Sequence, residues 1–279
     1  MTGAALALGS AVCLGVADYA GGLLARRTDA AAVAFVVQAG GAVLVLAVAP
    51  TVPAAALTWQ DVGWGALSGV GTAIGVLFLY RGLTNGPMTV VVPLSTVGGV
   101  VLPVLVGFTL LGERPSLLSW LGIAVAVPAI PLISAANGRP ARADAAATAE
   151  ALTSSVGFAL QYIALAQTGS ASGLWPVAAG RVASVLTMLA LAGGPQTLLG
   201  LRRGLALRAG LNGAVAASGL TLYMLATRYE IMAVAVVLSS LYPVIPVLLG
   251  IAVLRERLTV RQAAGLVGAG ATIVLVTAG

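Results

Sequence analysis

A long internal repeat is the strongest constraint on the fold of this chain. The segment PVLVGFTLLGER, which starts at Pro103, returns as PVLLGIAVLRER from Pro246, 143 positions further along. The same offset pairs other positions without a gap, among them Leu79 and Tyr80 with Leu222 and Tyr223, Asp18 with Gln161, Tyr19 with Tyr162, and Gln38 with Arg181. Solenoid repeats are only about 20 to 50 residues long. The longer period therefore predicts two related halves of one duplicated unit.

The composition indicates that lipid rather than water surrounds most of the chain. Hydrophobic residues make up 59% of the 279 residues and charged residues 8%, with a mean hydropathy of +1.06. Soluble domains carry about 25% charged residues. The 36 glycines lie largely inside apolar runs, where small residues let membrane helices pack closely.

Ten apolar runs occupy almost the whole chain, and each is close to the roughly 20 residues that cross about 30 Å of hydrocarbon. They cover residues 3–24, 31–50, 62–83, 88–111, 117–136, 149–166, 174–193, 209–227, 231–254 and 260–278. We interpret the first run as a retained helix, because no basic segment precedes it and Arg26 and Arg27 follow it. No segment is left over for a soluble domain.

The polar residues 137–148, NGRPARADAAAT, form the predicted linker between an N-terminal unit, residues 1–136, and a C-terminal unit, residues 149–279. Each unit holds five of the apolar runs, and an odd number makes the second unit enter the membrane from the opposite side. The predicted fold is therefore an all-α integral membrane protein with ten transmembrane helices in two inverted five-helix repeats. Such repeats place a binding site near the midplane and permit alternating access.

Two related segments resemble a known family. They are LYRGLTNGPMTVVVPLSTVGGVVLPVLVGFTLLGERPSLLSWLGIAVA, residues 79–126, and LYMLATRYEIMAVAVVLSSLYPVIPVLLGIAVLRERLTVRQAAGLVGAG, residues 222–270. Together they resemble the EamA-type family of the drug/metabolite transporter superfamily. The resemblance implies ten helices in two repeats and the transport of small metabolites, which include amino acids, nucleotide-related compounds, sugars or lipophilic compounds, frequently by export.

Polar residues deep in the apolar runs are the candidate substrate-binding residues, because an ionisable group in lipid is costly unless it faces water or a partner. Asp18 and Gln38 are expected at one depth, and their repeat counterparts Gln161 and Arg181 at another, with a separation of roughly 10 Å within a hydrocarbon core of about 30 Å. These two layers suit a substrate with a cationic group near Asp18 and an anionic group near Arg181. The alternative is a structural ion pair.

Aromatic residues and prolines recur at matched positions. The tyrosines complete the candidate site, where each offers a hydroxyl and a ring face; they are Tyr19, Tyr80, Tyr162 and Tyr223. Helix contacts are the alternative role for each of them. Pro103 and Pro246 are predicted in mid-helix, where proline bends the axis, either as gating hinges or to shape a cavity.

The Glu-Arg pairs that follow each matched proline segment favour a structural role over a binding site. Ser116 and Thr259 are placed to cap the helices that begin after these pairs, and Thr259 with Gln262 has the spacing of a capping box. The pairs are Glu113 with Arg114 and Glu256 with Arg257.

Several functional classes are disfavoured by composition. The chain has no histidine, and its single cysteine, Cys13, excludes an internal disulfide, so we expect no metal site and no cofactor. All 14 cations are arginines scattered over short loops, which argues against nucleic-acid binding. We expect no enzyme activity. A membrane sensor or scaffold and a lipophilic-drug efflux protein are the alternatives to a metabolite exporter.

The coupling ion, the orientation and the oligomeric state stay open. Asp18 is the only carboxylate well inside a run, so exchange of a proton for substrate is one hypothesis and facilitated diffusion is the other. We expect the plasma or inner membrane, and a monomer or homodimer. Odd-numbered loops hold 11 arginines and even-numbered loops 2, which favours cytoplasmic odd loops and external termini, whereas the family resemblance implies cytoplasmic termini.

Overall fold

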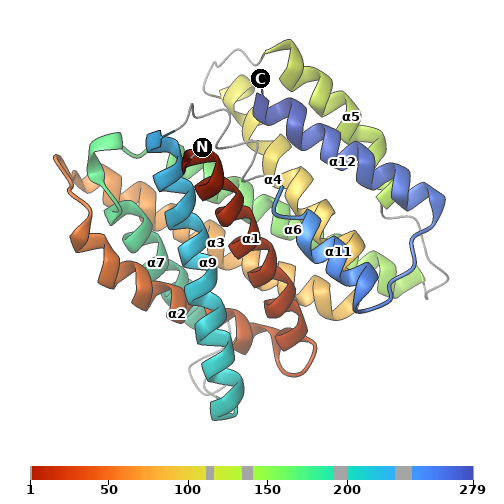
Figure 1. Cartoon of the computed structure of the whole chain (residues 1–279), viewed down its shortest axis with the longest axis horizontal. Helices are drawn as coiled ribbons and strands as arrows, with labels where there is room; N and C mark the ends of the chain where they lie inside the picture. Colours follow the sequence, from red (N-terminus) through yellow and green to blue (C-terminus); the bar gives the residue numbers. More distant parts are fainter. Residues whose placement is uncertain (1, 111–115, 134–140, 192–199, 230–240, 279) are drawn as a thin grey trace.

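The computed structural model describes residues 2–110, 116–133, 141–191, 200–229 and 241–278 (Figure 1). These ranges contain α-helices and two short 3₁₀ turns, and they contain no strand. The helices are α1 (Thr2–Ala25), α2 (Ala30–Val48), α3 (Trp59–Asn85), α4 (Met88–Leu110), α5 (Leu117–Ile133), α6 (Ala141–Ala166), α7 (Trp175–Leu191), α9 (Arg203–Tyr229), α11 (Val244–Ala252) and α12 (Val260–Ala278). The 3₁₀ turns are η1 (Ala49–Thr51) and η2 (Ser170–Ser172). The all-α prediction is confirmed.

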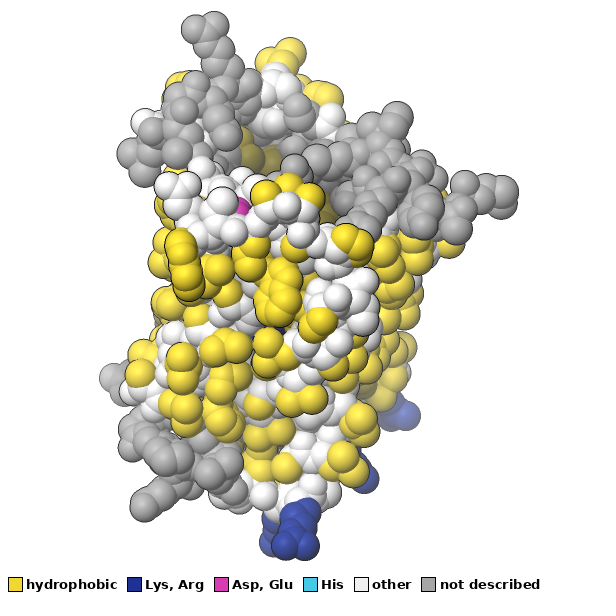
Figure 2. Space-filling view, turned by 90° about the vertical axis from the view of Figure 1, so that its left-hand side faces the viewer, with side chains coloured by type: hydrophobic (Ala, Val, Ile, Leu, Met, Phe, Trp, Pro, Cys, Tyr) yellow, Lys and Arg dark blue, Asp and Glu magenta, His cyan; other side chains and the backbone are white. Residues whose placement is uncertain are grey.

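The outer surface of the molecule is suited to lipid. Within the described ranges, four helices are long and apolar enough to cross a bilayer, over Gly3–Ala25, Ala30–Thr51, Trp59–Asn85 and Met88–Thr109. Figure 2 shows hydrophobic side chains across the middle of one face, while the arginines visible on that face gather at one end. This distribution is that of an integral membrane protein.

Helices of one repeat pack mainly on helices of the other, and they do so in equivalent pairs. Helix α3 lies along α6 just as the equivalent α9 lies along α1, and α3 packs on α7 just as α9 packs on α2. Helices α5 and α12, which are equivalent to each other, form a pair of their own beside the rest (Figure 1). This exchange of equivalent contacts is what a two-fold relation between the halves produces.

The loops show that the two repeats are inverted. The loop between α6 and α7 is equivalent to the loop between α1 and α2, yet it meets the loop between α2 and α3, at the other end of α2. There the backbone N–H of Ala56 donates to the carbonyl of Ala171 (3.2 Å), and that of Gly169 donates to Asp61 Oδ1 (2.6 Å). Equivalent loops therefore lie at opposite ends of the molecule, and both chain ends lie in the upper part of Figure 1.

Glycines allow the two repeats to approach backbone to backbone. A Cβ at Gly69 would collide with the backbone of Gly180, so α3 and α7 touch at this point. A Cβ at Gly213 would collide with the carbonyl of Val37, which brings α9 equally close to α2. In lipid, such small-residue contacts supply van der Waals attraction that larger side chains would prevent.

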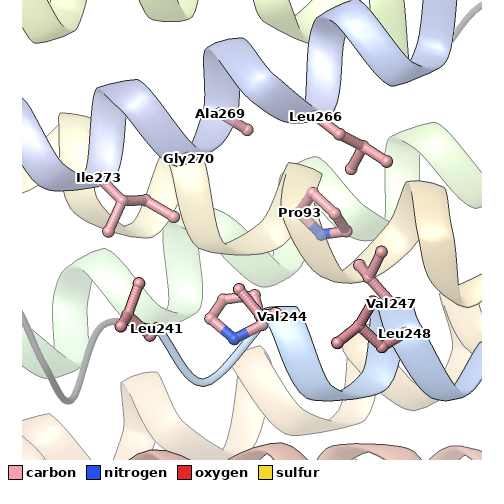
Figure 3. Close-up of a pocket in the computed structure, with 10 residues that line it drawn as sticks. Pro93, Leu241, Val244, Val247, Leu248, Leu266, Ala269, Gly270 and Ile273 are labelled. Atoms are coloured by element: carbon pink, nitrogen blue, oxygen red, sulfur yellow. The ribbon is translucent and has the colours of Figure 1, made fainter.

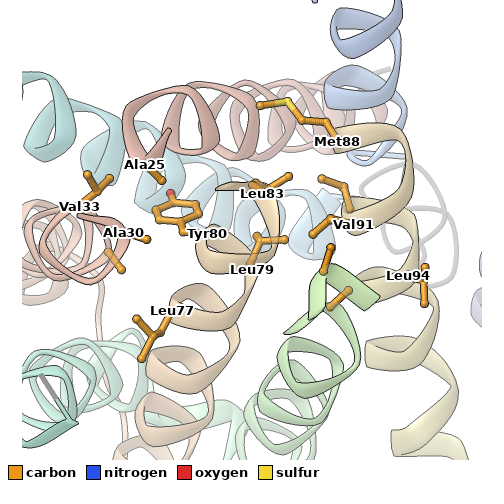
Figure 4. Packing of buried hydrophobic residues seen from close by; sticks show 14 of the residues in the cluster. Ala25, Ala30, Val33, Leu77, Leu79, Tyr80, Leu83, Met88, Val91 and Leu94 are labelled. Atoms are coloured by element: carbon orange, nitrogen blue, oxygen red, sulfur yellow. The ribbon is translucent and has the colours of Figure 1, made fainter. Parts of the chain in front are cut away.

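The buried core is shared between the halves. It includes Leu77, Leu79 and Leu83 of α3, and residues of α1, α2, α4, α6, α9 and α12 pack into the same cluster. Figure 4 shows the ring of Tyr80 within it, beside Ala25, Ala30 and Val33, while Val91 and Leu94 line the α4 side.

Two predictions about chain segments need correction. Helix α6 begins at Ala141, so the predicted linker 137–148 is helical from that residue onward; residues 145–148 are apolar or threonine, and Ala147 is buried in the core. Pro103 lies inside α4 as predicted. Pro246 instead lies in the first turn of α11, where no helical hydrogen bond from its backbone nitrogen would form in any case. Residues 230–240 lie outside the described ranges.

Candidate functional site

The most central polar contact joins Arg181 of α7 to Gln38 of α2. Arg181 Nη1 donates to Gln38 Oε1 at 2.6 Å, and the two residues are 143 positions apart. They are therefore equivalent positions of the two repeats. In a two-fold arrangement, a residue touches its own equivalent only beside the axis. The pair consequently marks the axis between the inverted repeats, midway along the molecule.

This contact corrects the predicted separation of the two polar layers. Gln38 lies about two turns into α2 from one end of the molecule, and Arg181 about two turns into α7 from the other end. The backbone positions are consistent with the predicted depths. The long arginine side chain crosses the interval of roughly 10 Å expected between the layers, so the two layers meet as one site.

Asp18 lies on α1 near this centre. It is half-buried, and within the described part of the chain it has no hydrogen bond or ion pair. Three tyrosines, Tyr80, Tyr162 and Tyr242, lie close enough to interact electrostatically with its carboxylate. Tyrosines of both repeats therefore lie within electrostatic range of this carboxylate.

Tyr80 connects the acidic and the basic member of the site. Its side chain is 3% exposed, and it lies within electrostatic range of both Asp18 and Arg181. The hydroxyl is pressed against Gly21 of α1, where any side chain would displace it. A glycine one turn after Asp18 thus makes room for the tyrosine beside the carboxylate.

Gln161, the repeat counterpart of Asp18, joins the basic part of the site. Its Oε1 accepts a hydrogen bond from Thr72 Oγ1 of α3 (2.9 Å). A cavity of about 20 Å³ adjoins both Gln161 and Arg181, which is room for about one water molecule. Its lining consists of Ser68, Thr72, Gln161, Leu165, Val177, Gly180, Arg181 and Leu220.

The predicted tyrosines have different surroundings. Tyr162 of α6 is 44% exposed and interacts electrostatically with Tyr223 of α9 as well as with Asp18. Tyr19 is next to Asp18 in the chain and packs against the hydrophobic cluster that also contains Tyr80, and its hydroxyl has no hydrogen bond among the described residues. Seven of the eight predicted residues share a hydrogen bond, a cavity or an electrostatic interaction with another member; Tyr19 shows only its packing against the core cluster.

Two central residues were missed by the sequence reasoning. Tyr242 shares a hydrogen bond with Thr96 of α4 (3.1 Å) and lies near Asp18 and Tyr162. Asn212 of α9 donates to the carbonyl of Ala17 (3.0 Å). Both were overlooked because their repeat counterparts are glycines and matched polar pairs were sought. The signal that would have found them is any polar side chain inside an apolar run.

Ionic contacts also hold the ends of the molecule. The carboxylate of Glu256 accepts the backbone N–H groups of Met88 and Thr89 at the start of α4, each at 3.0 Å. Arg26 approaches the same carboxylate at 3.5 Å and donates to the carbonyl of Leu83 (2.7 Å). Glu256 thus binds a helix N-terminus of the other repeat, where a negative charge is favourable.

The predicted caps are confirmed where the structure describes them. The N–H of Ser119 donates to Ser116 Oγ (3.1 Å), and Thr259 and Gln262 form the reciprocal bonds of a capping box (3.1 and 3.2 Å). Glu113 and Arg114 lie outside the described residues. Across the ranges that are described, no group of three or more histidine, cysteine, aspartate or glutamate side chains is placed to hold a metal ion.

Residues 1–135 match the model of the EamA-like transporter family. None of the curated proteins matches the chain.

Proposed function

From the match of residues 1–135 to the EamA-like transporter family, we propose that the chain is a secondary transporter of a small polar or amphipathic metabolite, such as an amino acid or a related compound. It works by alternating access between two inverted repeats, and it moves its substrate out of the cell across the plasma or inner membrane. The direction follows from the behaviour that the family resemblance implies.

One observation carries the proposal: an arginine on the axis between the repeats, with an unpaired aspartate nearby. Charged groups at this depth are expensive unless they meet water or a partner. Within the described ranges Arg181 has only the neutral Gln38 as a hydrogen-bond partner, and Asp18 has none. A scaffold without a ligand gains nothing from such groups, whereas a transporter needs them to replace the hydration of a polar substrate.

Counterflow in proteoliposomes tests this function. Vesicles loaded with one unlabelled compound are mixed with a labelled one, over a panel of amino acids, their amides, nucleosides and sugars. Saturable exchange of at least one compound, lost in Arg181→Gln, is the expected result. A folded protein that exchanges no compound of the panel would favour a membrane sensor or scaffold instead.

Proton coupling is the second part of the proposal, and Asp18 is the residue that supports it. A carboxylate exposed to the two sides in turn can bind a proton on one side and exchange it for substrate on the other. We expect Asp18→Asn to retain substrate counterflow but to lose substrate-driven proton movement, measured with a pH-sensitive dye inside the vesicles. Proton movement at the wild-type rate in this variant would remove Asp18 from the coupling.

An apolar groove supports a second candidate function, the efflux of lipophilic compounds. A groove of about 160 Å³ lies between α4, α11 and α12, lined mostly by aliphatic side chains. Figure 3 shows Pro93 facing Val244, Val247 and Leu248 across it, with Leu266 on the α12 side. If a lipophilic cationic dye is the substrate, Leu248→Trp should abolish its efflux and Arg181→Gln should not; the metabolite proposal predicts the reverse sensitivity.

A further inference from the structure

We propose that the transported compound carries a carboxylate, and that this group binds between the guanidinium of Arg181 and the side-chain amide of Gln38. The inference rests on the proposed function and names the class of its substrate. It starts from two observations on the described residues: the amide nitrogen of Gln38 has no hydrogen-bond acceptor, and Arg181 has no ion-pair partner.

Gln38 presents a buried donor that nothing satisfies. The residue is 1% exposed, its Oε1 accepts from Arg181, and its Nε2 has no hydrogen-bond partner among the described residues. Buried amide groups in folded proteins are nearly always bonded, because an unpaired donor loses its hydration without compensation. The unpaired Nε2 of Gln38 belongs to the same amide that binds the guanidinium of Arg181. One acceptor group placed beside both would therefore satisfy the two donors together.

Arg181 lacks a counter-charge in the same region. No ion pair involves it within the ranges that the structure describes, and its bond to Gln38 uses one of the five N–H donors of a guanidinium. The cavity that adjoins Arg181 adds the hydroxyls of Ser68 and Thr72 and the amide of Gln161, while Gln38 lies outside its lining. A carboxylate fits this set, since its two oxygens accept from a guanidinium in a planar, charge-assisted geometry.

The difference between the two repeats explains how the site can be stable without substrate. Two arginines at positions that touch across the axis would repel each other, whereas glutamine offers a neutral oxygen that holds the guanidinium. A substrate carboxylate would take the place of that oxygen, and rotation of the amide would then turn Nε2 toward the substrate. Asp18, which like Arg181 lies within electrostatic range of Tyr80, disfavours a second negative charge, so a zwitterion suits the site better than a dicarboxylate.

The test compares compounds that differ only at the carboxylate. Phenylalanine, lysine and threonine are each assayed in counterflow beside their carboxamides and their decarboxylated amines. At least one acid should exchange about ten to a hundred times better than its amide, which is the loss expected for one charged hydrogen-bonded group. In Arg181→Gln the exchange of that acid should fall to the level of its amide.

Two further variants separate binding from folding. Gln38→Glu places a fixed carboxylate beside Arg181, so the protein should unfold at the same or a higher temperature while acid exchange is lost. The double variant Gln38→Arg with Arg181→Gln exchanges the two side chains across the axis, and it should recover acid preference that Arg181→Gln alone has lost. Recovery of thermal stability without acid preference would show a purely structural pair and overturn the proposal.

The outcomes distinguish this inference from the function on which it rests. If amides, amines, sugars or nucleosides exchange saturably and as fast as the acids, the transporter function stands but the carboxylate site is refuted. Exchange of no compound by folded wild-type protein would refute both. Acid preference that survives in Arg181→Gln would place the carboxylate elsewhere and also overturn the assignment.

Discussion

The two repeats agree in their backbone contacts and differ in their polar side chains. Close glycine contacts of α3 with α7 and of α9 with α2 bring equivalent pairs of helices together, although Gly69 and Gly213 differ by one position in the repeat. At the equivalent positions nearest the axis, however, Gln38 faces Arg181, and Asp18 corresponds to Gln161. Duplication therefore supplied a symmetric scaffold, and later divergence gave it one acidic and one basic region.

This difference separates what the scaffold needs from what the substrate needs. Inverted repeats can exchange conformations to open toward either side, because each half can adopt the arrangement of the other. That exchange depends on the shared contacts. Recognition of an asymmetric molecule depends on the unlike charges. Substitutions at the shared helix contacts should therefore act on stability, whereas substitutions of the charged residues should act on substrate recognition.

The largest expected effect lies in the shared scaffold. Gly69→Ala and Gly213→Ala each place a Cβ against the backbone of a facing helix, so each should lower the free energy of unfolding by about 1 to 3 kcal/mol or more. Because each added Cβ meets a backbone carbonyl oxygen of the facing helix, the two losses should be similar. Unfolding of the detergent-solubilised protein by added SDS measures both.

Gly210→Ala is the matched control on α9. A Cβ at this position meets no atom within 4 Å, so stability should be unchanged or slightly higher, as alanine favours a helix over glycine. Equal losses in Gly210→Ala and Gly213→Ala would show that the effect comes from the helix itself and not from its contact with α2.

A smaller effect is expected at the end of the molecule where Glu256 binds the start of α4. Glu256→Gln removes the charge that two backbone N–H groups and Arg26 share, and it should cost about 1 to 3 kcal/mol. Glu150→Gln is the control, since Glu150 accepts one exposed bond from Asn85 (2.8 Å). Thermal unfolding that responds equally to both substitutions would deny Glu256 a special role between the repeats.

The fold could be predicted to a large extent, because the repeat and the apolar runs each reflect a strong physical constraint. Apolar runs long enough to cross the bilayer located most helices to within a few residues, as for Met88–Leu110 and Leu117–Ile133. The linker failed because polarity alone does not end a helix: residues 141–148 are rich in alanine, a strong helix former. Pro246 was misplaced because a repeat in sequence does not guarantee the same helix start.

The sequence identified most residues of the candidate site, but it predicted their relative positions less well. Depth along a helix follows from residue counting, which found Asp18, Gln38, Gln161 and Arg181. Rotation about the helix and side-chain reach do not follow from it. The packing of Tyr19 against the core cluster and the direct bond between Arg181 and Gln38 were therefore not foreseen. Helix rotation and side-chain contacts depend on how the two repeats pack together, and the sequence of a single apolar run does not determine this packing.

Alternating exposure of the central site is the claim on which the account depends most. Gln161 lines the cavity beside Arg181, and with Cys13→Ala the variant Gln161→Cys carries a single thiol. Its modification by a membrane-impermeant thiol reagent, measured separately from each face of sealed vesicles, tests the claim directly. We predict reaction from both faces, with the two rates shifted in opposite directions by a transported substrate. Reaction from one face only, or from neither, would contradict alternating access at this site.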